Sequence, residues 1–375
     1  MNFENKNEKL KTQELMPMPE IKTEVNSGYF WYTFLQKANN LDWEQLNNKN
    51  NFSKQLDKYF NENKLDENLK QKWQSVIYEI NNDEILFWFS LAINNPELEN
   101  TVFEDCVKHK DLEKEKAELL FQEFKSVVDE FKEKYSNVWN LLKPHLNEDI
   151  EKRNNSNEEK EIIQDCLDYF KPYKETSDIQ EVNYLPTNPL IKETKGNGFV
   201  SKNVGIIISN FENSNSKTHE FLHCIINPIT EKLNLSEQEK KKIIQMADEK
   251  LIIDQNYGEH PESLLNENLI RVYCELIKEN KKPINLEIFK NFIINLTEKE
   301  FTKLKSDNLN FFNEMKIVNL ENLKSRIKEI YNRKIKNILG EKIYNLYQNF
   351  EKEKQNNPGL TFEDYFLENF KMILE

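Results

Sequence analysis

The pattern His-Glu-x-x-His at residues 219–223 constrains this chain of 375 residues more than any other feature. Residues four apart lie on the same face of a helix, so His219 and His223 can bind one metal ion together. Glu220 then lies beside that ion, where its carboxylate can act as a general base. The chain holds only five histidines, so the pattern favours a zinc centre over two histidines that merely hydrogen-bond to neighbours.

The residues around the motif also fit such a centre. A β-like run at 204–209 precedes it, and we expect this strand to bind an extended substrate through Gly205, Ile207 and Ser209 along an exposed edge. Pro228 comes soon after the motif and is expected to kink or end the helix, because proline lacks an N–H donor. The expected order is therefore strand, loop and metal-binding helix.

A catalytic zinc ion usually has three protein ligands, so a third must come from outside the motif. Residue 229 is Ile rather than His, which excludes the metzincin pattern. Glu267 is the first choice, because it lies in an apolar helical segment where a carboxylate is costly to bury unless it binds a metal or a cation. Arg271 can orient it, and an exposed Glu267–Arg271 surface pair is the alternative. The other candidate ligands are Glu262, Glu275 and His260.

Two stretches resemble a known family. Residues 218–228, Thr-His-Glu-Phe-Leu-His-Cys-Ile-Ile-Asn-Pro, resemble the active-site segment of the bacterial domain of unknown function 4932 family, where a His-Glu-Phe-x-His core precedes a hydrophobic pair and Asn-Pro. Residues 267–271 are similar to that family's Glu-x-x-x-Arg helix, and the resemblance extends from about residue 29 to about residue 300. It implies a zincin-like metallopeptidase of the gluzincin type, with Glu267 as third ligand. No Gly-x-Met-Glu-Asn segment lies upstream, so an aminopeptidase is not supported.

The predicted chemistry is hydrolysis of a peptide bond by an endopeptidase or oligopeptidase. Zn²⁺ held by His219, His223 and Glu267 activates water, and Glu220 takes its proton and passes it to the leaving amine. Donors to the developing oxyanion are expected nearby, and the candidates are Tyr257 and His260. The alternative is a catalytically silent helical interaction protein that retains a zincin fold.

The composition of the chain limits the classes of partner that it is expected to bind. The chain has 65 acidic and 52 basic residues and a net charge of −13, which disfavours nonspecific nucleic-acid binding. No apolar run is long enough for a membrane span or a signal peptide, so we expect a cytoplasmic protein, or a secreted one if a signal peptide was removed. The four cysteines show no Cys-x-x-Cys spacing, which argues against a structural zinc site and for a reducing compartment. The expected partner is a peptide or protein substrate, and no feature indicates an oligomeric state.

The distribution of Gly and Pro predicts the organisation of the chain. We expect a mainly helical α+β fold in four parts: a polar, flexible tail at 1–25, a helical region at 26–165, a zincin-like catalytic core with a small sheet and an active-site helix at 166–300, and a C-terminal helical region at 301–375.

Three local patterns predict particular helices. Residues 85–89 are apolar on every side and indicate a central, buried helix. Apolar residues spaced by three and four between 120 and 139 predict one long amphipathic helix that ends by Pro144. Ser236 and Glu239 form a capping box, which predicts the start of a further helix.

Overall fold

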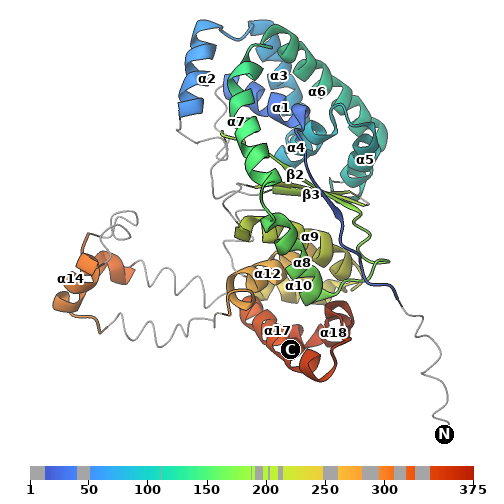
Figure 1. The fold of residues 1–375 in the computed structure, drawn as a ribbon, viewed down its shortest axis with the longest axis vertical. Coiled ribbons are helices and arrows are strands. Elements are labelled where there is room, and N and C mark those ends of the chain that lie inside the picture. Colours follow the sequence, from blue (N-terminus) through green and yellow to red (C-terminus); the bar gives the residue numbers. More distant parts are fainter. Residues whose placement is uncertain are drawn as a thin grey trace. The chain divides into compact units, whose positions relative to one another are not determined.

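The computed structural model describes residues 13–39, 51–110, 112–186, 188–190, 197–201, 203–209, 214–247, 261–280, 295–307, 318–325 and 338–375. Within these ranges the chain is mainly helical with one four-stranded sheet (Figure 1), which confirms the mainly helical α+β prediction. The chain divides into two compact units, Met1–Cys224 and Ile225–Glu375, and the boundary in sequence falls inside helix α9 (Ser214–Glu231). No helix in the described ranges combines the length and apolar character needed to cross a membrane.

Eight helices are described in the first unit, and capping residues explain where three of them begin. Asn26, Asp66 and Asn82 each precede a helix, and the side chain of each accepts a hydrogen bond from a backbone N–H of the first turn. The helices are α1 (Ser27–Ala38), α2 (Asn51–Glu62), α3 (Glu67–Ile80), α4 (Asp83–Ala92), α5 (Pro96–Lys110), α6 (Lys114–Lys134), α7 (Val138–Asn154) and α8 (Glu158–Phe170).

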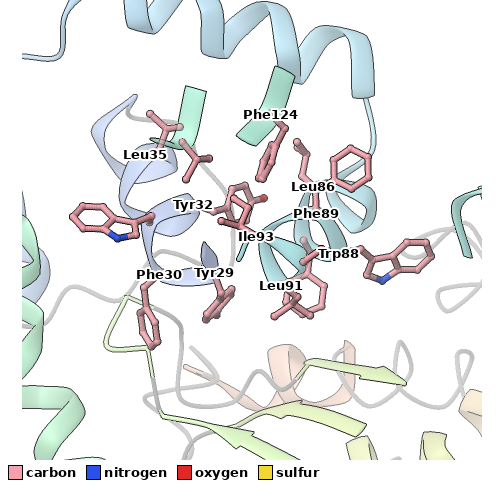
Figure 2. Close-up of a cluster of buried hydrophobic side chains, with 14 of the residues drawn as sticks. Tyr29, Phe30, Tyr32, Leu35, Leu86, Trp88, Phe89, Leu91, Ile93 and Phe124 are labelled. Atoms are coloured by element: carbon pink, nitrogen blue, oxygen red, sulfur yellow. The ribbon is translucent and has the colours of Figure 1, made fainter. Parts of the chain in front are cut away.

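Helix α4 lies at the centre of the hydrophobic core of this unit. Every residue from Ile85 to Ala92 is buried, which confirms the prediction of a central helix. Figure 2 shows Tyr32 of α1, Phe89 of α4 and Phe124 of α6 in one cluster, and the Phe124 ring centroid lies 5.8 Å from that of Tyr32 and 5.9 Å from that of Phe89. Burying each such side chain stabilises the fold by roughly 1.5–3 kcal/mol. The helices α1, α4 and α6 therefore share one buried core.

The single helix predicted between residues 120 and 139 is wrong, because the chain turns after α6. The turn begins at Tyr135, whose hydroxyl donates to the Lys64 carbonyl at 3.0 Å and accepts from the Asp66 N–H at 2.9 Å. These bonds tie the end of α6 to the connection between α2 and α3. Pro144 then lies inside α7 rather than after a helix end.

Four strands form the sheet in the order β1-β2-β4-β3. They are β1 (Glu20–Thr23), β2 (Glu181–Leu185), β3 (Asn197–Ser201) and β4 (Val204–Ile208). β2 is parallel to both β1 and β4, whereas β3 is antiparallel to β4. β1 belongs to the segment predicted to be a flexible tail; it is ordered because it pairs with β2, a partner far along the chain.

The two faces of the sheet pack differently. Ile206 and Ile208 of β4 belong to the core that contains the helices of the first unit. Side chains alternate between faces along a strand, and Gly205 accordingly meets the side chain of Cys224 of α9 on the other face. Burial on both faces explains the continuous apolar run of β4. The sheet thus lies between the helical core and the start of α9.

Helix α9 continues through Pro228, where an end or a kink was expected. The proline removes one N–H from the helix, but hydrogen bonds nearby hold the next turn. The Thr230 hydroxyl lies 2.9 Å from the Asn227 carbonyl and also contacts the side chain of Asn266. Packing against a second helix therefore stabilises α9 beyond the proline.

The second unit, Ile225–Glu375, is helical in its described ranges. Helix α10 opens with the predicted capping box of Ser236 and Glu239, which is confirmed. Helix α12 passes directly into the π-helix η2. Near this junction the Tyr347 hydroxyl donates a hydrogen bond to the Leu269 carbonyl at 3.2 Å. The helices are α10 (Glu237–Met246), α12 (Pro261–Val272), the π-helix η2 (Tyr273–Ile277), α14 (Glu298–Asp307), α17 (Ile338–Asn356), α18 (Phe362–Asn369) and α19 (Lys371–Leu374).

Candidate metal centre

Helix α9 carries both motif histidines on one side. The ring centroids of His219 and His223 lie 5.1 Å apart, as expected for residues one turn apart, and both side chains are half-buried. Glu220 lies between them in sequence and is only 8% exposed. The first half of α9 therefore presents two nitrogen ligands beside a shielded carboxylate.

Glu267 supplies a buried carboxylate on α12. Its side chain is 6% exposed, against 39% for Arg271, whose Nε donates to Glu267 Oε1. An uncompensated charge at such a position would be costly, so the arginine neutralises the carboxylate and fixes its orientation. The alternative of an exposed Glu267–Arg271 surface pair is wrong, because the carboxylate is buried.

The ligand atoms of His219, His223 and Glu267 all lie within 4.8 Å of one another. Among the described residues, this is the only group of His, Cys, Asp or Glu side chains that meets the geometry of a metal site. Tetrahedral zinc with bonds of 2.0–2.2 Å places its ligands roughly 3.4 Å apart. Small rotations of the three side chains would bring them to that spacing, so the donor set fits zinc and leaves a fourth position open.

Of the other candidate ligands, Glu262 and Glu275 do not join this group, and His260 lies outside the described residues. The carboxylate of Glu262 pairs with Lys240 at 3.2 Å, and Glu275 is exposed. Tyr257 and His260, the candidate oxyanion donors, lie outside the described residues. Cys224 follows the second histidine directly but is 1% exposed, and burial raises the pKa of its thiol to about 12. The Cys224 side chain packs against Gly205 of the sheet and is not part of the ligand group.

The prediction that Gly205, Ile207 and Ser209 offer an exposed edge is wrong. Gly205 and Ile207 lie in β4, which has β2 on one side and β3 on the other, so both of its edges are already paired; Ser209 follows the end of β4. Ile207 and Ser209 are 1% and 2% exposed, and the Ser209 carbonyl accepts a hydrogen bond from Arg153 at 2.7 Å. Among the described strands, β3 is the outer strand on this side of the sheet.

Strand β3 was missed in the sequence, although one signal pointed to it. Ser201 pairs with Val204, so only two residues connect β3 to β4. Two residues are the commonest length of a β-hairpin loop. The run Gly-Phe-Val at 198–200, just before that connection, would have indicated the partner strand. Its glycine, Gly198, lies directly against Glu220.

Comparison of the chain with protein-family models, curated proteins and solved structures gives no match. The resemblance of residues 218–228 and 267–271 to the domain of unknown function 4932 family therefore stays a proposal.

A buried charge cluster holds the start of α9 in place. The guanidinium of Arg153, fully buried at the end of α7, donates to Asp149 at 2.7 Å and contacts Glu159. The Lys217 ammonium, also fully buried, lies 3.2 Å from Glu158 and 3.7 Å from Glu159. Arg153 also donates to the carbonyl of Ser209, the residue that follows β4, so the cluster joins α7, α8, the end of β4 and α9. It fixes the turn of helix that precedes the motif.

We expect Arg153→Met to lower the free energy of unfolding by about 3–5 kcal/mol, because it removes the buried cation that pairs with both Asp149 and Glu159. Urea denaturation followed by circular dichroism measures this change. The neighbouring Lys152→Met is the control, since Lys152 forms an exposed pair with Glu148 at 2.9 Å that should contribute about 0–1 kcal/mol. Equal effects of the two substitutions would contradict a structural role for the cluster.

Proposed function

We propose that this protein is a zinc-dependent peptidase with a zincin-like core, similar in plan to the domain of unknown function 4932 family. The observation that carries the proposal is the convergence of the ligand atoms of His219, His223 and Glu267 within 4.8 Å. The position of Glu220 supports it further, because this buried carboxylate lies on the same helix as both histidines.

Each side chain then has a distinct role. His219, His223 and Glu267 hold the ion, and Arg271 keeps the Glu267 carboxylate oriented. Bound zinc supplies Lewis acidity, which lowers the pKa of water towards about 7 and polarises a carbonyl. Glu220 accepts the proton of the attacking water and returns it to the leaving amine. Its burial strengthens the electrostatic interactions it makes.

The outer strand β3 is the surface that best suits an extended peptide. Among the described strands it pairs only with β4, so its other edge can accept a further strand by main-chain hydrogen bonds. Gly198 of β3 lies against the Glu220 side chain, which places that edge close to the proposed base. We infer that the substrate is a peptide or protein segment in extended conformation.

Two measurements test the proposal. The protein purified without added metal should contain one zinc ion per chain by elemental analysis, and His219→Ala should contain much less, because one of three ligands is lost. A library of quenched fluorescent peptides should be cleaved by the wild type. A chelator should stop cleavage and added zinc should restore it.

The outcomes separate the proposed peptidase from its alternative. Near-zero zinc in both the wild type and His219→Ala would overturn the metal site. Full zinc in the wild type without cleavage of any peptide would favour the catalytically silent interaction protein. His145→Ala is a matched control, since this histidine lies on α7 outside the ligand group and its loss should leave the zinc content unchanged.

A further inference from the structure

Gly198 of β3 lies closer to Glu220 than a residue with a side chain could. A Cβ atom built at Gly198 would lie 2.9 Å from Glu220 Oε2, 3.4 Å from Glu220 Cβ and 3.6 Å from its carbonyl oxygen. The first distance is shorter than real Cβ contacts. The Glu220 carboxylate therefore occupies the space that any other residue at position 198 would fill.

A second glycine shows that this approach belongs to the packing of α9 on the sheet. A Cβ atom at Gly205 of β4 would lie 3.1 Å from Cys224 Sγ, one helical turn beyond Glu220. Gly205 pairs with Val200 and Ile207 pairs with Gly198, so the two glycines lie on the same face of the sheet. The side of α9 that carries Glu220 and Cys224 thus packs on two neighbouring strands, each at a glycine.

The contact at position 198 affects Glu220 but not the two motif histidines. Successive residues of a helix are turned by roughly 100°, so His219 and His223 form a stripe beside the one that carries Glu220 and Cys224. The three atoms nearest to a Cβ at position 198 all belong to Glu220. The nearest of these atoms is Glu220 Oε2, which lies at the movable end of the glutamate side chain.

We propose that Gly198 is a positioning residue: its missing side chain lets β3 hold the Glu220 carboxylate in the orientation needed for proton transfer. The inference rests on the proposed peptidase function, in which Glu220 is the base. In this role Gly198 acts through Glu220, separately from the edge of β3 that is proposed to bind substrate. A Cβ at position 198 would turn the carboxylate out of that orientation while α9 and β3 keep their places.

The test is Gly198→Ala, with Gly205→Ala as the matched control on the neighbouring strand. Gly198→Ala should lower kcat by about 10²-fold, because small misplacements of a reacting group have effects of that size. KM, zinc content and Tm should stay close to wild type. Gly205→Ala meets Cys224 rather than Glu220, so its kcat should match the wild type. Equal loss of kcat in both variants, or loss of zinc in Gly198→Ala, would overturn the proposal.

A second substitution distinguishes positioning of Glu220 from a general structural effect. Glu220→Asp shortens the side chain and should lower kcat in the wild-type background. In the Gly198→Ala background it should lower kcat much less, because the carboxylate is already displaced and the shorter one avoids the added methyl. Additive effects would contradict the inference.

Crystal structures of the wild type and Gly198→Ala test the positioning of Glu220 without a measurement of activity. The inference requires a rotated Glu220 side chain with α9 and β3 unmoved. A Glu220 carboxylate left in place, with β3 shifted away, would overturn it. If the wild type cleaves no peptide, the proposed function fails, whereas the crystal structures still show whether Gly198 sets the position of Glu220.

Discussion

Glu220→Gln should retain zinc and the fold but lower kcat for peptide hydrolysis by about 10²–10⁴-fold. The amide has nearly the same shape as the carboxylate but cannot accept and return the proton. Both histidines and Glu267 remain in place, so the zinc content should match the wild type. Steady-state kinetics on the best library peptide, elemental analysis and thermal denaturation measure the three quantities.

The control for this variant is Glu231→Gln, the same substitution at an exposed position near the end of the same helix. It should have wild-type kcat and zinc content. An unchanged kcat in Glu220→Gln would remove Glu220 from the mechanism. A loss of zinc in that variant would instead make Glu220 a ligand.

Glu267→Ala should weaken zinc binding by more than the roughly 10–100-fold typical of losing a residue that only supports a ligand. The substitution removes a ligand oxygen and leaves the Arg271 guanidinium without its carboxylate partner. Competition of the protein with a chromogenic chelator measures the affinity. Thermal denaturation of the metal-free protein should show the stability lost with the ion pair.

Two carboxylates on the same stretch of chain serve as controls. Glu262→Ala breaks an ion pair with Lys240, and Glu275→Ala removes an exposed side chain of η2, so neither should change zinc affinity. Wild-type affinity in Glu267→Ala would exclude it as the third ligand, and the two histidines would then need another partner. That result would leave the expectation for Glu220→Gln unchanged.

Features that depend on neighbours in the sequence could be predicted. The capping box of Ser236 and Glu239 and the apolar segment at 85–89 carry their signals within a few residues, and both form the expected helices. The spacing of the motif histidines is equally local, because a helix alone determines that both lie on one side. Glu267 could be singled out because a carboxylate within an apolar helical pattern, followed by Arg271, requires an explanation.

Features that depend on pairing between distant segments could not be predicted in the same way. The apolar residues of β4 indicate a strand but not its neighbours, and the neighbours decide whether it has a free edge. The turn at Tyr135 depends on hydrogen bonds to residues near 65, which the helical spacing does not reveal. The closeness of Gly198 to Glu220 likewise follows from how α9 packs on the sheet.

The parallel pairing of β1 with β2 bears on how the chain folds. Lys22 of β1 and Glu181 of β2 are 159 positions apart yet form an ion pair, and helices α1 to α8 lie between the strands in sequence. Contacts of such long range slow folding, because the intervening chain must first be brought together. The sheet beneath the proposed site would therefore close late, after the helical core has collapsed. Until then the open edge of β2 would be available to strands of other chains, which makes this stage the one most prone to aggregation.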